Sequence, residues 1–128
     1  MRSNPNAEPT SATRSTPNSI AELRAALRGR VIATDDPDYE SARLVVNAAV
    51  DRRPAMIVRP AHATDVSLAV SLARTHGLEL AIRGGGHSLA GHGTSDGGLV
   101  LDMSSMRGLH IDPQRQIAWA QAGLTAGD

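Results

Sequence analysis

The sequence predicts an α/β fold, α+β in detail, in which a βαβ lobe precedes an antiparallel β lobe. The first lobe is indicated by apolar runs at 55–58 and 78–82 that flank an amphipathic segment at 64–76. Strand, helix and strand within about thirty residues are typical of a βαβ unit with parallel strands and a right-handed crossover. The second lobe is indicated by short apolar runs between 99 and 120, separated by turn residues. At 128 residues the chain forms at most one ordinary domain.

A capped helix and a short strand open the predicted fold. Ser19 and Glu22 have the spacing of a capping box, and an apolar stripe follows them to about Arg28. Gly29 is the predicted stop of this helix, and residues 30–33 form the next strand. After a polar turn, the segment 39–47 is ambiguous, because it combines apolar residues with poor capping residues.

The βαβ unit begins with the strand at 55–58, which Pro54 and Pro60 bracket at its ends. Thr64 is the predicted N-cap of the helix, and Asp65 follows in the first turn, where the helix dipole favours a negative charge. Gly77 is the predicted stop. The predicted buried face has i, i+3, i+4, i+7 spacing and consists of Val66, Ala69, Val70 and Ala73.

Beyond this unit lies a long loop, 84–98, without apolar periodicity, and loops of this length are usually functional. Short strands at 99–101, 108–111 and 116–120 then predict an antiparallel meander, with the last strand half-buried. Residues 124–128 look like the start of a helix.

Composition excludes several classes of partner and site. Acidic and basic residues balance at 13 each, which argues against nucleic acid and anionic membranes, and aromatic residues make up only 2%. The absence of cysteine excludes disulfides and thiolate metal sites within these residues, and no apolar run approaches the roughly 20 residues of a membrane span. We expect a cytoplasmic protein. Residues 1–17 predict a disordered tail, and 18–128 predict a domain that is incomplete at its end.

The most informative stretch is Arg83-Gly84-Gly85-Gly86-His87-Ser88. Consecutive glycines allow the backbone to curl its N–H groups toward one point, which forms an anion-binding nest. This stretch follows directly after the second strand of the βαβ unit, and ligands of open α/β sheets bind beyond the carboxyl ends of the strands. The sequence therefore predicts a phosphate seat here.

Other interpretations of the glycine stretch fit less well. In the dinucleotide fingerprint G-x-G-x-x-G, the third glycine would fall at Leu89 or Asp96. In a P-loop, His92 would occupy the lysine position. A metal site from His87, His92 and Asp96 lacks a recognised ligand spacing, and Ser88 beside His87 is not a nucleophile elbow.

The chain from about Leu23 to Asp128 resembles the PCMH-type FAD-binding domain of the vanillyl-alcohol oxidase superfamily, and within it the berberine-bridge-enzyme-like and 6-hydroxynicotine-oxidase-like flavoproteins. The resemblance is carried by the glycine stretch, by Asp-Gly-Gly-Leu-Val-Leu-Asp-Met-Ser at 96–104 and by Gln-Ala-Gly at 121–123. It implies that the glycine loop holds the FAD pyrophosphate and that His87 is the residue bonded covalently to the flavin in many members. The cofactor-binding residues predicted in this way are Arg83, Gly84, Gly85, Gly86, His87, Ser88, Gly91, His92 and Gly123. For Asp102 we expect a structural role, as a strand-end residue that accepts a hydrogen bond from the following turn.

The resemblance also implies a function. We expect the FAD-binding portion of a flavin-dependent oxidoreductase that acts on C–H bonds of alcohol, amine or sugar-like substrates, with FAD at the junction of the two lobes. In the family the substrate-binding region and the catalytic acid or base come later in the chain, so no catalytic residue is predicted here. No metal ligand is predicted either, because the histidine spacing is not a recognised ligand pattern. The alternative is a non-catalytic truncated remnant or nucleotide-binding module, and enzyme activity stays open at this point.

Overall fold

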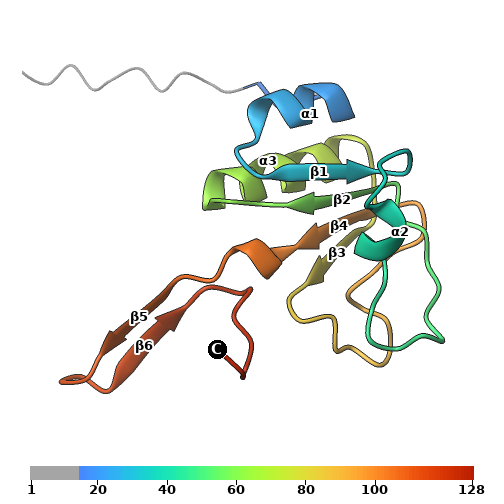
Figure 1. The fold of residues 1–128 in the computed structure, drawn as a ribbon. Helices are drawn as coiled ribbons and strands as arrows, with labels where there is room; N and C mark the ends of the chain where they lie inside the picture. The colour runs from blue at the N-terminus through green and yellow to red at the C-terminus, as the bar shows by residue number, and fades with distance from the viewer. Residues whose placement is uncertain (1–14) are drawn as a thin grey trace, which may run out of the picture.

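The computed structural model describes residues 15–128, which fold into a four-stranded mixed sheet and a separate two-stranded hairpin (Figure 1). Most of the predicted tail, residues 1–14, lies outside the described residues, and Pro17 at its end is buried. No helix in the described part of the chain has the length and hydropathy needed to cross a membrane.

The first helix, α1 (Ile20–Ala26), begins at the predicted capping box. The Ser19 hydroxyl accepts a hydrogen bond from the backbone N–H of Glu22, and the Glu22 carboxylate accepts one from the N–H of Asn18. The prediction that Gly29 stops this helix is wrong, because α1 ends earlier and Leu27 is already extended. Glycine is needed at position 29 for another reason: the backbone of Arg59 lies so close that a β-carbon on residue 29 would overlap its carbonyl oxygen.

Strand β1 (Arg30–Ala33) follows and pairs antiparallel with β2 (Met56–Arg59). The ambiguous segment forms only a one-turn helix, α2 (Tyr39–Ala42), which is fixed by the Tyr39 hydroxyl donating to the carbonyl of Pro54. The remainder of this segment is irregular.

The helix of the βαβ unit is α3 (Ala63–Thr75), and it leads to β3 (Leu80–Arg83). Asp65 lies in its first turn, as predicted, but the N-cap is His62 and not Thr64. The predicted buried face is partly wrong, because Val70 is exposed whereas Leu68 and Leu72 are buried beside Ala69 and Ala73.

The predicted three-stranded meander is also wrong in its first strand. β4 (Leu99–Asp102) lies between β2 and β3 and pairs parallel with both, so the sheet order is β1-β2-β4-β3. The physical reason is burial on both faces: Leu99, Val100 and Leu101 form the unbroken apolar run typical of a parallel strand. The long loop 84–98 supplies the crossover that such a connection needs.

The antiparallel lobe consists of β5 (Leu109–Asp112) and β6 (Ile117–Ala120), after a 3₁₀ turn, η1 (Met103–Ser105). This hairpin points away from the four-stranded sheet (Figure 1), so β6 is exposed along its whole length and not half-buried as predicted. Residues 124–128 form a turn and not a helix in this structure.

Two apolar clusters hold the sheet. On one face, Val58, Leu99 and Leu101 pack against α1 and α3. On the other face, Ile57, Ala81 and Val100 pack against α2 through Tyr39 and Ala42. Because side chains alternate along a strand, the strand-end residues Arg59, Arg83 and Asp102 share the face that α2 covers.

Asp65 connects α3 to the chain before β1, and its replacement by asparagine is expected to destabilise the fold by about 3 kcal/mol. Its carboxylate accepts hydrogen bonds from the N–H groups of Arg28, Gly29 and Ala61, and the side chain is 2% exposed. In the variant, the amide NH₂ of the new side chain would face these donors. Urea denaturation of Asp65→Asn measures the loss; a change below about 1 kcal/mol would contradict this role.

Acid should weaken the same connection. Burial alone would raise the pKa of Asp65, but hydrogen bonds from the backbone of Ala61, Arg28, Gly29 and His62 hold the pKa below its ordinary value. A carboxyl whose pKa is lowered on folding adds stability above its unfolded pKa of about 3.9, and this stability disappears as the pH falls through the folded pKa. Wild type should therefore lose more stability than Asp65→Asn below about pH 4.

Candidate functional site: the glycine loop and the strand ends beside it

The glycine run lies where β3 ends, at the carboxyl edge of the parallel strands. Among residues 15–128, the backbone N–H groups of Gly84, Gly85, Gly86 and His87 have no hydrogen-bond acceptor. Gly86 has a φ of +72°, which turns the chain in the left-handed sense that a nest requires. Four successive donors are therefore available to an anion.

An ion-paired group of three side chains lines the same cavity as these glycines. The Arg83 side chain is 6% exposed and donates to Asp102 Oδ2 at 3.0 Å and to the carbonyl of Ala42 at 2.6 Å. Arg59 Nε donates to the same carboxylate oxygen at 2.8 Å. The other Asp102 oxygen accepts from the N–H of Ser104, which confirms its expected role at the strand end.

The electrostatics of Asp102 follow from this arrangement. Burial alone would raise the pKa of Asp102, but the hydrogen bond from Arg59, the charge of Arg83 and the N–H of Ser104 together hold the pKa below its ordinary value. Asp102 is therefore a permanent anion at neutral pH, and it fixes the two arginines.

A cavity of about 380 Å³ opens in front of the glycine run. It is lined by Ser41, Ala42, Leu44, Val45, Val46, Arg59, Arg83, Gly84, Gly85, Gly86, Asp102 and Ser104. The lining brings together the predicted residues Arg83 and Gly84–Gly86, although the Arg83 guanidinium points into the protein toward Asp102. His87 is exposed, and a β-carbon on Gly85 would lie 3.0 Å from its ring, so the imidazole lies against the glycine run.

The second half of the loop is a separate turn. The Ser88 carbonyl accepts from the N–H of Gly91, and its hydroxyl accepts from the N–H of His92. Gly91 has a φ of +79° and packs against Val50, and Arg52 donates to its carbonyl. The lining found among the described residues includes none of the predicted residues Ser88, Gly91 and His92.

The segment 121–125 borders the glycine run on its other side. A β-carbon on Gly84 would lie 3.1 Å from the carbonyl oxygen of Ala122, and one on Gly85 would lie 3.8 Å from the Thr125 side chain. Gly123 anchors this segment: it is buried, and its N–H donates to the carbonyl of Met106 at 2.9 Å. The structure thus brings Gly123 close to the glycine run, but as an anchor on η1.

Sequence reasoning missed Arg59, and the pairing of strands was the signal that could have identified it. The register pairs Arg83 with Asp102, and it pairs Val58 with Leu101, the residue before Asp102. This places Arg59 on the opposite side of Asp102 from Arg83. The sequence did not indicate that β4 lies between β2 and β3.

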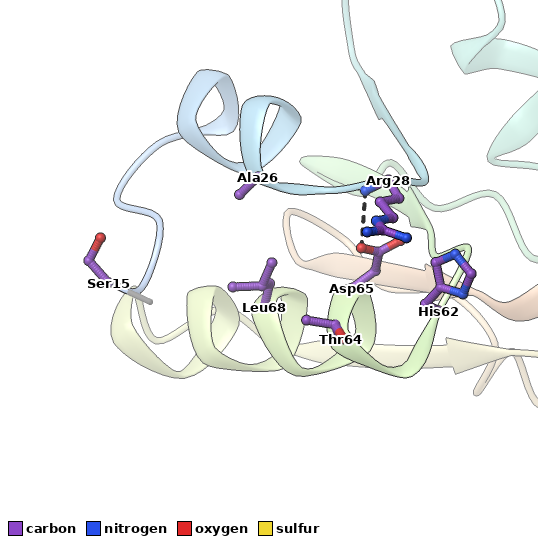
Figure 2. Close-up of a pocket in the computed structure, with 7 residues that line it drawn as sticks. All are labelled: Ser15, Ala26, Arg28, His62, Thr64, Asp65 and Leu68. Carbon is purple, nitrogen blue, oxygen red and sulfur yellow. Dashed lines mark hydrogen bonds between the residues drawn. The ribbon is translucent and has the colours of Figure 1, made fainter. Parts of the chain in front are cut away.

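A larger cavity, of about 480 Å³, lies elsewhere, at the start of α3 (Figure 2). It is lined by Ser15, Ala26, Arg28, His62, Thr64, Asp65 and Leu68. Figure 2 shows the Asp65 carboxylate turned toward the backbone N–H of Arg28, so this carboxylate is already hydrogen-bonded within the fold. None of the predicted site residues lines this cavity. Within residues 15–128, no group of three or more His, Asp or Glu side chains is placed to hold a metal ion.

Residues 54–128 match the family described as the FAD binding domain. The chain belongs to this family. It is 36% identical to (R)-6-hydroxynicotine oxidase from Paenarthrobacter nicotinovorans, over 80% of this chain and 22% of that protein. It is 39% identical to berberine bridge enzyme-like 14 from Arabidopsis thaliana, over 60% of this chain and 15% of that protein. The predicted resemblance to these flavoproteins is confirmed.

A solved structure confirms the fold of this FAD-binding domain. Crystalline 6-hydroxy-D-nicotine oxidase from Arthrobacter nicotinovorans superimposes with a TM-score of 0.77 at 34% identity, over 88% of this chain and 23% of that one. The chain therefore spans about a quarter or less of the length of these relatives.

The residues at the glycine loop fit the diphosphate of FAD. Gly84, Gly85 and Gly86, whose N–H groups have no acceptor among the described residues, line a cavity whose charged lining residues are two arginines and one carboxylate, so the lining carries a net positive charge. Side chains at 84 and 85 would crowd Ala122 and His87. Glycine at both positions avoids this crowding and leaves the backbone accessible to a ligand. An anionic group such as a diphosphate therefore matches the charge and the N–H donors of this lining.

Proposed function

We propose that this chain is the pyrophosphate-binding part of an FAD-dependent oxidoreductase. The observation that carries the proposal is the run of four N–H groups, Gly84 to His87, that have no acceptor within residues 15–128 and lie at the carboxyl edge of the parallel strands. Each N–H donates to a diphosphate oxygen, and the two arginines that line the same cavity, Arg59 and Arg83, offset the negative charge. FAD supplies the redox chemistry, by accepting a hydride from a C–H bond of the substrate.

His87 is the residue proposed to tether the flavin. Its imidazole is exposed and lies against Gly85, beside the donors assigned to the diphosphate. In the tether, an imidazole nitrogen replaces one hydrogen of the flavin 8α-methyl group. Forming this bond would release two electrons and two protons, one proton from the methyl group and one from the imidazole, and O₂ would accept them to give H₂O₂. The bond prevents loss of the cofactor and changes its redox potential.

The substrate class that we propose is an alcohol, amine or sugar-like molecule. The support is the family and the name of one relative, (R)-6-hydroxynicotine oxidase, because nicotine is an amine. The residues that would meet such a substrate are not assigned to this chain, which supplies the cofactor seat. A cytoplasmic location is part of the same proposal.

Flavin retention after acid denaturation tests the tether. The protein at its full natural length should keep yellow colour in the acid pellet, and His87→Ala should release the flavin into the supernatant. His92→Ala is the matched control, because its imidazole lies in the same loop but in the separate turn that begins at Ser88, and it should keep the colour. Flavin that is bound but released by wild type would contradict the tether alone. Wild type with no flavin, bound or covalent, would contradict the proposed function.

A further inference from the structure

Arg59 has hydrogen-bonding capacity that the fold does not use. Its Nε donates to Asp102, and among residues 15–128 its Nη atoms have no acceptor. Arg83 differs, because its Nη atoms donate to Asp102 and to the carbonyls of Ala42 and Leu44. Its side chain is 6% exposed, against 32% for Arg59. Of the two arginines on one carboxylate, Arg83 is therefore committed to the fold and Arg59 is available.

The position of Arg59 directs this capacity to the glycine loop. Arg59 ends β2 on the sheet face that also carries Asp102 and Arg83, and it lines the cavity together with Gly84–Gly86. Asp102 holds the guanidinium by its Nε, so the planar group is oriented before a ligand arrives. Pre-orientation reduces the entropy lost when an arginine binds an oxyanion.

We propose that Arg59 is a second anion-binding group of this cavity, and that its Nη atoms contact the diphosphate of FAD opposite the glycine N–H donors. This inference rests on the proposed function, since it names a further residue of the same site. Asp102 then acts as a positioning residue for Arg59. The guanidinium supplies charge-assisted hydrogen bonds, which are about twice as strong as those from neutral N–H groups.

Quenching of flavin fluorescence in titrations of FAD with purified, flavin-free protein of full natural length tests the inference. All titrations use a His87→Ala background, which cannot form the tether and therefore binds FAD reversibly, and wild type here means wild type at positions 59 and 74. Arg59→Met should raise the dissociation constant for FAD about tenfold or more, because one charge-assisted contact is lost. Arg59→Lys should have a dissociation constant between those of wild type and Arg59→Met, since lysine keeps the positive charge but lacks the paired N–H donors of the guanidinium. Arg74→Met is the control: it removes the same charge from an exposed position in α3, on the opposite face of the sheet, and should leave the constant within about twofold of wild type.

Competition with inorganic pyrophosphate separates a diphosphate contact from a structural effect. Pyrophosphate should displace FAD from wild type and should be about tenfold less effective against Arg59→Met. Equal inhibition constants in both proteins, or FAD binding by Arg59→Met within about twofold of wild type, would overturn the role of Arg59 while leaving the proposed function intact. Wild type that binds no FAD would overturn the proposed function itself, which is a different result.

Discussion

Replacing Asp102 by asparagine is expected to destabilise the chain by about 3–5 kcal/mol, the cost of leaving a buried arginine without its counter-charge. Asp102 and Arg83 are 3% and 6% exposed, and the substitution places an uncharged amide between two guanidinium groups. The carbonyls of Ala42 and Leu44 still solvate Arg83, so we expect the lower half of this range. Urea denaturation followed by circular dichroism measures the change.

Asp38→Asn is the matched control for Asp102→Asn. It also removes the carboxylate of an ion pair, here the one between Asp38 and Arg30. Both side chains of this pair are about half exposed, so loss of the pair should cost less than about 1 kcal/mol. Equal effects in the two variants would contradict the account of the buried group. Because folding lowers the pKa of Asp102, its contribution should also diminish as the pH falls below about 4.

Gly123→Ala should have the second large effect, and it should act on the site as well as on the fold. A β-carbon at this position would overlap the carbonyl oxygen of Met103 and would lie 2.7 Å from that of Met106. Both obstacles are backbone, so the segment 121–125 must move away from η1. We expect a loss of about 1–3 kcal/mol and weaker FAD binding, because this segment borders Gly84 and Gly85.

Gly127→Ala controls for the loss of a glycine near the same segment, two residues beyond its end. A β-carbon at 127 would meet no atom within 4 Å, and the residue does not have a positive φ. This variant should match wild type in both stability and FAD affinity. If Gly123→Ala behaves like Gly127→Ala, the segment is not anchored at Gly123 as described.

Local signals in the sequence predicted local structure. The capping box of Ser19 and Glu22 marked the start of α1, and the turn residue Gly77 marked the end of α3. The glycine run was placed at the end of a strand, where it lies. Each of these features depends on residues within a few positions of one another, so one stretch of sequence contains the whole signal.

Features that depend on distant strands were not predicted. The position of β4 is set by pairing with β2 and β3 across long intervals of sequence, and nearby turn residues suggested a hairpin instead. The Arg59–Asp102–Arg83 group follows from that pairing, so Arg59 was missed and Asp102 was assigned only its local bond to Ser104. The helix face was misjudged at Val70 because the neighbouring apolar residues Leu68 and Leu72 fit the same period.

Amide chemical shifts test most directly whether the N–H groups of Gly84–His87 hold the diphosphate of FAD. In ¹⁵N-labelled protein, addition of FAD should move the amide resonances of these four residues, and ADP should move them in the same direction, because the diphosphate is the shared group. The amides of the control turn Asp112–Arg115, at the far end of the β5–β6 hairpin, should stay in place. Saturation with FAD that shifts other amides and leaves those of Gly84–His87 unchanged would contradict the account.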